Sequence, residues 1–528
     1  MTSAATGRAG LAATAASIAL TLAVGLAGPS AMEPALPAGP GQPGQHGQPP
    51  WAFGLHLSPY LAIGLAAAAL VAGTAGLGLC LSALRRGWTV SPRAVLAAGL
   101  MTATAMALIP PFGSSDHVSY AAYGRMVVTG HNPYLTTPAM LAASGDPVAR
   151  AVQDWRASPS VYGSLATGGQ ALASWIGGDS ARLTVFVLSL LGLAAFAGTG
   201  LLLHLLTRGS RARQLRAGLV WTLNPLLLQV LVAGAHVDSQ AIVFAVAAIA
   251  IFALGMPSAG AASLRGLGVA AAAGAVAGLA FAVKLSYVLV AAGLVVAALL
   301  TWWPRAGTGP RARRWRPLAL AVGGVTAGFL VTAAASAAPW GLGSVDPALR
   351  AGSFVSIGSP WRAVRSGLRL LTGESAANDL VKAGAIVLAV LLLALFTRPL
   401  LALAAGPATL ITLAAACSFA LVFAWLAAWP YVLPWYDGLA WALLALLPWA
   451  PLPWAALPWA ALDWLVLART AALAFGYLPA RGIALPAGLG WLQSVVRTGV
   501  TPVILLAVTV ALIVVLRRGR GSVPTTRS

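Results

Sequence analysis

The residues with the clearest chemical potential lie in a polar run that follows a long apolar segment. Asp116 opens this run, Tyr120 and Arg125 follow it, and a Gly-His-Asn132-Pro-Tyr134 turn closes it. A carboxylate in such a place can take the proton of a hydroxyl group that attacks a second substrate. Two alternatives stay open. Ser-Ser-Asp before an amphipathic helix is also a common N-terminal cap, and Arg125 could contact a phosphate or occupy the polar face of a surface helix.

Three further places in the chain could complete a site. His236 and Asp238 lie in a short turn between apolar segments, where they could share a proton, contact a donor or bind a divalent ion, although two ligands do not define a metal site. Lys284 separates two apolar runs and could hold a phosphate or extend its ammonium group to the membrane interface. Trp435 and Tyr436 could pack on a sugar, but both residue types also gather at any membrane interface.

A membrane-embedded scaffold must position these groups. Of the 528 residues, 59% are hydrophobic and 8% are charged, whereas a soluble domain has roughly 25% charged residues. Apolar runs long enough to cross a hydrocarbon core of about 30 Å recur along the chain. The pattern predicts an all-α fold, a polytopic transmembrane helical bundle of about 12 to 14 spans, with the uncertainty in the proline-rich part between 438 and 475. We expect spans near residues 9–28, 59–84, 93–112, 181–206, 216–233, 238–256, 266–283, 285–303, 317–338, 380–397, 400–425, 438–450, 454–475 and 497–516.

The net charge of +21 is best explained by topology and not by a nucleic-acid partner. Arginines cluster in short connections between apolar runs, the pattern of cytoplasmic loops in membrane proteins. This places both termini in the cytoplasm and predicts outer loops at 113–180, 339–379 and 426–437, with helices lying in them. Ten of the eleven acidic residues, all but Asp463, then lie outside or at the outer membrane edge. We therefore expect the chemistry on the outer face of the plasma membrane.

The remaining organisation follows from composition. Residues 1–28 contain the first apolar segment, either a transmembrane helix or a signal-like sequence. A Pro/Gly-rich outer segment at 29–58 is predicted to be disordered, residues 59–516 form the transmembrane domain, and residues 517–528 form a basic cytoplasmic tail. The two cysteines, Cys80 and Cys417, lie in apolar segments and favour neither a disulfide nor a cysteine metal site. Asn224, beside Pro225 in the middle of a predicted span, is expected to satisfy a helix break.

The run from Asp116 to Tyr134, together with Asn224-Pro225-Leu226 and Gly234-x-His236-x-Asp238, resembles the actinobacterial polyprenol-phosphomannose-dependent α-1,6-mannosyltransferases. These are glycosyltransferases of the GT-C architecture. Val237 stands between His236 and Asp238, where the family more often has asparagine. The resemblance covers most of the chain from about residue 60.

The resemblance implies an enzyme that moves mannose from polyprenyl-phosphate mannose to a lipid-linked α-1,6-mannan of the lipomannan type. Asp116 matches the general base of an inverting displacement. No cofactor is implied, and a divalent metal is possible but not indicated. The expected partners are the two lipid-linked substrates and membrane lipids. Protein partners are not defined. The candidate substrate-binding residues are Arg125, Asn132, Tyr134, His236, Asp238, Lys284, Trp435 and Tyr436.

Two alternatives remain at this point. One is a GT-C transferase for another polyprenyl-phosphate sugar, such as arabinose. The other is a transporter or flippase for a lipid-linked saccharide, which would carry polar residues along a path through the bilayer. The predicted crowding of ionisable residues at the outer edge favours a transferase.

Overall fold

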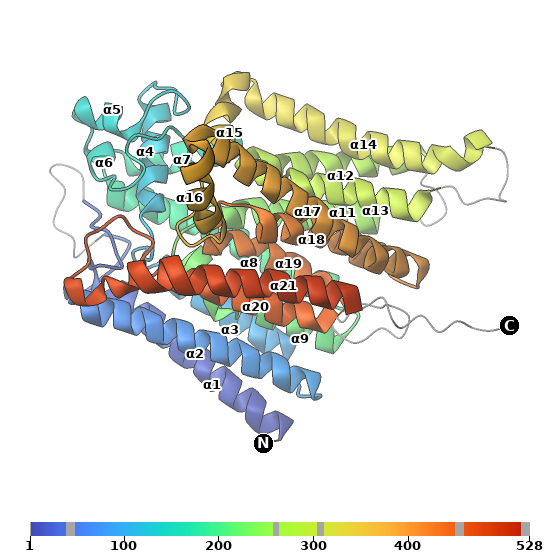
Figure 1. Ribbon diagram of the computed structural model, residues 1–528, viewed down its shortest axis with the longest axis horizontal. Helices are drawn as coiled ribbons and strands as arrows, with labels where there is room; N and C mark the ends of the chain where they lie inside the picture. The colour runs from blue at the N-terminus through green and yellow to red at the C-terminus, as the bar shows by residue number, and fades with distance from the viewer. Residues whose placement is uncertain (1, 38–47, 257–262, 304–310, 449–458, 519–528) are drawn as a thin grey trace.

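The computed structural model describes residues 2–37, 48–256, 263–303, 311–448 and 459–518, and these ranges form a bundle of helices packed side by side (Figure 1). Twelve helical segments in the described ranges are long and apolar enough to cross a membrane, which confirms the predicted polytopic helical fold. They are α1 (Ser3–Ala27), α2 (Pro59–Arg85), α8 (Ala181–Leu206), the segment Arg211–Val232, α11 (Asp238–Gly255), α12 (Leu264–Val283), the segment Leu285–Trp302 with α13 (Val288–Trp302), α14 (Arg311–Ala337), α17 (Glu374–Ala405), α18 (Leu410–Ala428), α20 (Trp459–Gly476) and the segment Ala487–Arg518 with α21 (Thr501–Arg518).

Two predicted spans form helices that are too short to qualify. The helix α3 (Pro92–Ala107) has 16 residues and α19 (Asp437–Leu446) has 10, and the end of the predicted span 438–450 lies outside the described residues. The predicted boundary at residues 397–400 is wrong, because α17 continues through Pro399 to Ala405. A proline inside a helix removes one hydrogen bond, but here the helix ends only at Gly406, which is followed by Pro407.

The prediction of disorder for residues 29–58 is wrong where the structure describes them. Met32 and Leu36 are buried in the main core. The backbone also pairs with other segments: Gly113 N–H donates to the Met32 carbonyl at 2.7 Å, and Phe53 N–H donates to the Leu26 carbonyl at 2.7 Å. A few apolar side chains and these backbone bonds hold an otherwise Pro/Gly-rich segment in place. Residues 38–47 lie outside the described ranges.

The helix break at Asn224 is satisfied as predicted. Its side-chain oxygen accepts hydrogen bonds from the backbone of Leu226 and Leu227, and its side-chain nitrogen donates to the Val220 carbonyl at 3.0 Å. A short π-helix, η1 (Leu228–Val232), follows and leads into the turn that carries His236. The break therefore lets one membrane segment end in a polar turn without leaving orphaned backbone groups. Both cysteines are free and buried.

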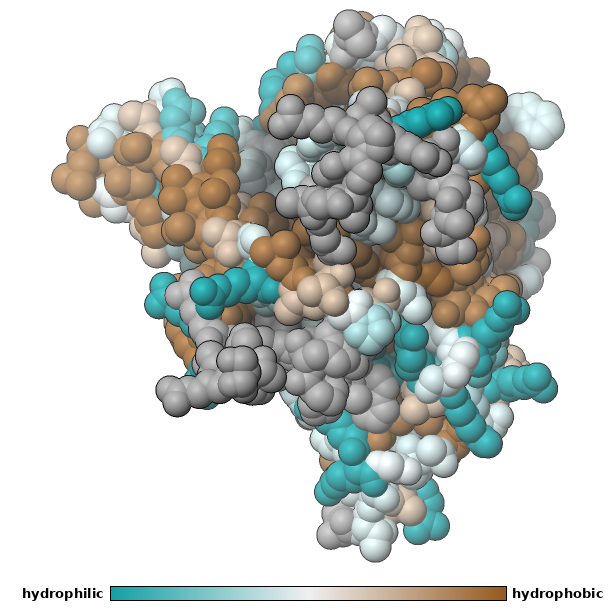
Figure 2. Space-filling view, turned by 90° about the vertical axis from the view of Figure 1, so that its right-hand side faces the viewer, coloured by the Kyte–Doolittle hydropathy of each residue, from teal (hydrophilic) through white to brown (hydrophobic). Residues whose placement is uncertain are grey.

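The two ends of the bundle differ in character. The loop helices α4 (Asp116–Val128), α5 (Pro138–Ala143), α6 (Pro147–Arg150), α7 (Ser164–Gly177), α15 (Asp346–Ala351) and α16 (Trp361–Thr372) gather toward the left-hand end in Figure 1. The opposite end carries the C-terminus, the start of α14 and the end of α17 (Figure 1). Figure 2 views the molecule from that end and shows hydrophilic side chains in separate patches among hydrophobic ones. Asp463 pairs there with Arg216 and lies 3.6 Å from Arg85.

Candidate active site

A cavity of about 400 Å³ opens among the loop helices. Four of the predicted site residues line it: Asp116, Lys284, Trp435 and Tyr436. They come from three parts of the chain that are far apart in sequence, namely α4, the junction before α13, and the 3-10 turn η4 (Pro434–Tyr436). His236 and Asp238 stand directly behind these lining residues, as described below. Six of the predicted residues thus meet at one place.

Asp116 is the first residue of α4 and lies at the cavity wall, with 13% of its side chain exposed. Its carboxyl Oδ2 lies 3.7 Å from Nδ1 of His236. Burial raises the pKa of Asp116 to about 7, an effect that a hydrogen bond with Trp155 partly offsets. A carboxyl group with a pKa near neutrality can both hold and accept a proton at physiological pH. The capping alternative loses support, because this side chain contacts His236 and Trp155 and not the first turn of α4.

His236 is buried between three side chains. Its Nε2 lies 3.2 Å from the Ser114 hydroxyl and its Nδ1 lies 3.4 Å from the Tyr120 hydroxyl. The imidazole ring stacks on Trp435 with 3.6 Å between ring centroids. Burial lowers the pKa of His236 well below its usual value, so the ring is neutral and its contact with Asp116 is polar, not ionic. This arrangement fixes the ring beside the carboxyl of Asp116.

Lys284 and Asp238 form a buried ion pair beneath the cavity. The Lys284 ammonium donates to Asp238 Oδ1 at 2.7 Å and stands 3.6 Å from the centroid of the Tyr436 ring. Lys284 therefore does not extend to the membrane interface, and Asp238 already compensates its charge. Asp238 contacts Lys284, while His236 faces Asp116, so these two neighbours in sequence serve different parts of the site.

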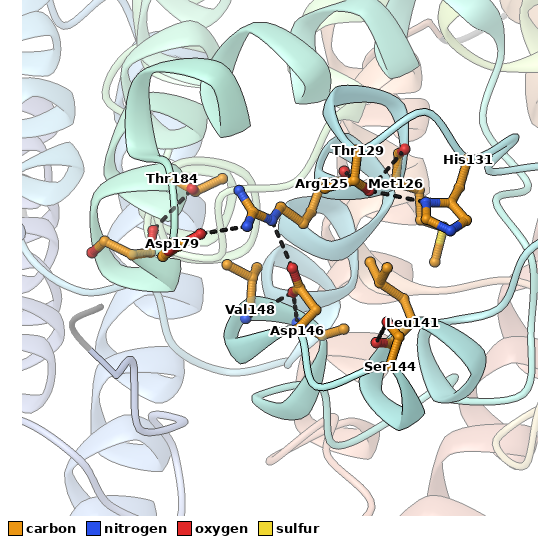
Figure 3. Close-up of polar contacts among 12 residues, drawn as sticks. Arg125, Met126, Thr129, His131, Leu141, Ser144, Asp146, Val148, Asp179 and Thr184 are labelled. Atoms are coloured by element: carbon orange, nitrogen blue, oxygen red, sulfur yellow. Dashed lines mark hydrogen bonds and ion pairs between the residues drawn. The ribbon is translucent and has the colours of Figure 1, made fainter. Parts of the chain in front are cut away.

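Arg125, Asn132 and Tyr134 do not reach the cavity. Figure 3 shows Arg125 between two carboxylates: its Nε donates to Asp146 at 2.7 Å, and its terminal nitrogen pairs with Asp179. The side-chain oxygen of Asn132 accepts from the backbone of Tyr134 at 2.9 Å, which closes the turn.

The side chain of Tyr134 is likewise committed elsewhere. Its hydroxyl lies 2.9 Å from that of Thr167 on α7, and the residue is buried. Arg125 and Tyr134 thus join separate parts of the loop region, and Asn132 shapes the turn between them. Their placement gives no support to the predicted substrate-binding roles.

The cavity also has residues that the sequence reasoning missed. Trp155 lines it with a positive φ of 61°, a left-handed conformation that is uncommon for a bulky side chain. Its ring stacks on Phe354 with 6.4 Å between centroids. Arg350, on α15, lines the same cavity. Trp155 could have been suspected as an aromatic residue in the predicted outer loop of Asp116, whereas no spacing or motif connects Arg350 or Phe354 to that loop.

Metal coordination needs several ligating side chains close together. No three His, Cys, Asp or Glu side chains come together there in a way that could hold a metal ion. The described residues therefore give no candidate metal centre.

Comparison with known proteins gives the family. A family model described as alpha-(1->6)-mannopyranosyltransferase, N-terminal domain, matches residues 22–301, more than half of the chain. This chain belongs to that family. The matched region contains Asp116, His236 and Lys284. The helical bundle, with its twelve candidate spans in the described ranges, is that of a multi-pass membrane protein.

One curated relative is alpha-(1->6)-mannopyranosyltransferase B of Corynebacterium glutamicum. It is 31% identical over 133 residues, which is 25% of this chain and 22% of the relative. The aligned part thus spans less than a quarter of the relative's length. No solved structure matches this mannosyltransferase-family chain.

Proposed function

We propose that this protein transfers mannose from polyprenyl-phosphate mannose to a lipid-linked α-1,6-mannan at the outer face of the plasma membrane. Membership of the mannopyranosyltransferase family supports the sugar and the reaction class. The position of the cavity supports the side of the membrane, because it lies among the loop helices, at the end of the bundle away from the connection that carries Arg85 and Arg86. Arg-rich connections are the mark of cytoplasmic loops.

The proposed reaction is a single displacement with inversion. A hydroxyl oxygen of the acceptor attacks the anomeric carbon of the donor, and its proton passes to the carboxylate of Asp116. The electron pair of the breaking carbon–oxygen bond goes to the phosphate, which leaves with its polyprenyl chain. Contacts with His236 and Trp155 hold the carboxyl of Asp116 in one orientation. The aromatic side chains of the wall provide flat apolar faces for sugar rings.

One observation carries this proposal: among the described residues that line the cavity, Asp116 alone bears a carboxyl group, and burial raises its pKa to about 7. The test uses purified protein in detergent with labelled polyprenyl-phosphate mannose and a short mannan acceptor. A transferase forms a new glycosidic bond in the micelle, and the Asp116→Asn variant forms almost none. A flippase would give no such product, because it needs two compartments. Preference for polyprenyl-phosphate arabinose as donor would instead support the arabinosyltransferase alternative.

A further inference from the structure

Two cationic side chains line the cavity in the described part of the chain, and they differ in their partners. Lys284 is bound to Asp238 at 2.7 Å and is covered by the ring of Tyr436. Arg350 is exposed, and none of the ion pairs or side-chain hydrogen bonds among the described residues engages its guanidinium group. The cavity thus has one compensated cation and one that is available to a ligand.

The segment that carries Arg350 is held against the wall that carries Asp116. Phe354 follows α15 by a few residues, and its ring stacks on Trp155 and meets the Tyr431 ring edge-on at 5.9 Å. Trp155 in turn hydrogen-bonds Asp116. These contacts place the free guanidinium and the buried carboxyl around the same cavity, although 234 residues separate them in the sequence.

The charge of the donor fits this arrangement. A sugar linked to a polyprenyl chain through phosphate is a phosphodiester with one negative charge, and the cavity offers one uncompensated positive charge. We propose that Arg350 binds this phosphate, the role that the sequence suggested for Lys284; this inference rests on the proposed function. Asp238 neutralises the charge of Lys284, and the resulting ion pair positions the ring of Tyr436.

The geometry of arginine suits the chemistry of the leaving group. When the bond between the anomeric carbon and the phosphate oxygen breaks, its electron pair stays on that oxygen, and the phosphate becomes a monoester with a second charge. The planar guanidinium can donate to two phosphate oxygens at once. The interaction between Arg350 and the phosphate therefore strengthens as the negative charge develops. It stabilises the transition state more than the bound substrate, and so it lowers the activation barrier.

The test compares Arg350→Gln and Arg350→Lys with Arg362→Gln. Arg362 is an exposed arginine on α16, in the same predicted outer loop, and it does not line the cavity. The binding probe is a short-chain polyprenyl phosphate, and transfer is measured in parallel. We expect Arg350→Gln to weaken binding at least about 10-fold and to lower kcat by about 10²-fold, the typical cost of losing one donor to a developing anion. Arg350→Lys should recover part of both, and Arg362→Gln should match the wild type.

Competition identifies the source of the phosphate. Inorganic phosphate and phosphatidylglycerol at equal concentration should not displace the polyprenyl phosphate; displacement by phosphatidylglycerol would mark Arg350 as a general headgroup contact and overturn the inference. Wild-type transfer combined with equal behaviour of Arg350→Gln and Arg362→Gln would also overturn it while leaving the proposed function intact. Polyprenyl phosphate binding that depends on Arg350, in a protein without transferase activity, would support the inference and reject the proposed function.

Discussion

At the scale of single residues, the decisive side chain is Asp116, and its substitution by asparagine separates catalysis from structure. The amide has nearly the same shape but cannot accept the proton, so transfer should fall by at least about 10²-fold, the lower range for general-base assistance. The wild-type rate should rise with pH through about 7, because burial raises the pKa of Asp116 to about that value. Turnover across pH 5.5–8.5 checks both, with Asp379→Asn as the control, because Asp379 is an exposed carboxyl in the first turns of α17 and does not line the cavity. Near-normal transfer by Asp116→Asn would remove this residue from the chemistry.

The same raised pKa predicts an effect on stability. Folding favours the protonated form of Asp116, so its contribution to stability is complete below its ordinary pKa of 3.8 and is lost as pH rises through about 7. The asparagine variant carries no such charge. Its Tm relative to the wild type should therefore increase between pH 5.5 and pH 8.5. A constant difference across this range would mean that the carboxyl does not titrate near neutrality.

The Lys284–Asp238 pair gives a second prediction at this scale. Lys284→Met or Asp238→Asn alone leaves a buried unpaired group, which typically costs about 3–5 kcal/mol. The double variant should regain much of this loss, because it removes both charges. Thermal unfolding of the four proteins in detergent measures the coupling. Additive losses would contradict a direct pair, and unchanged polyprenyl phosphate binding in the folded double variant would agree with the assignment of the phosphate to Arg350.

At the scale of elements, helix α4 explains which motif residues reach the site. An α-helix turns by about 100° per residue, so Tyr120 and Tyr123 lie on nearly the same face as Asp116, while Arg125, nine residues on, lies about half a turn away. The structure agrees, because both tyrosines line the cavity and Arg125 binds Asp146 and Asp179. The motif thus contains both residues that line the cavity and residues that stabilise the fold. Their helical spacing along α4 was sufficient to tell the two groups apart.

The role of Arg125 as a connector of loop helices can be tested directly. Arg125→Gln breaks two ion pairs that join α4 to Asp146 before α6 and to Asp179 after α7. We expect a lower Tm and faster proteolysis of the loop helices, with a much smaller loss of kcat than in Asp116→Asn. Arg150→Gln, an exposed arginine on α6, is the control and should change neither. A loss of activity at unchanged stability would instead return Arg125 to the substrate site.

At the scale of the whole molecule, the sequence predicted the helical bundle well, because the thickness of a bilayer fixes how long each apolar run must be. It also singled out Asp116, Lys284, Trp435 and Tyr436, which the structure brings together around one cavity, since polar residues between apolar runs are few. It missed Arg350 and Phe354, because their distance from Asp116 depends on how the segment after α14 folds back, and local patterns do not encode that path. It also missed the packing of residues 29–37, where two apolar side chains outweigh a Pro/Gly-rich composition.

The predicted orientation in the membrane needs its own test. The native cysteines Cys80 and Cys417 are buried, so the wild type should not react with an impermeant thiol reagent in intact cells. Ser366→Cys, exposed on α16, should react, and Thr89→Cys, exposed beside Arg85 and Arg86, should react only after the membrane is opened. The reverse pattern would place the cavity on the cytoplasmic side and rule out the proposed location of the reaction.

The cavity wall is divided between two halves of the chain. The family-matched half, residues 22–301, supplies Asp116 and Lys284, while Arg350, Phe354, Trp435 and Tyr436 come from the half that follows. Each half alone therefore builds only part of the cavity. Changes beyond residue 301 would alter which ligand fits the cavity while leaving Asp116 in place. Chimeras that exchange the residues beyond 301 between relatives should then change the substrate preference without changing the chemical step.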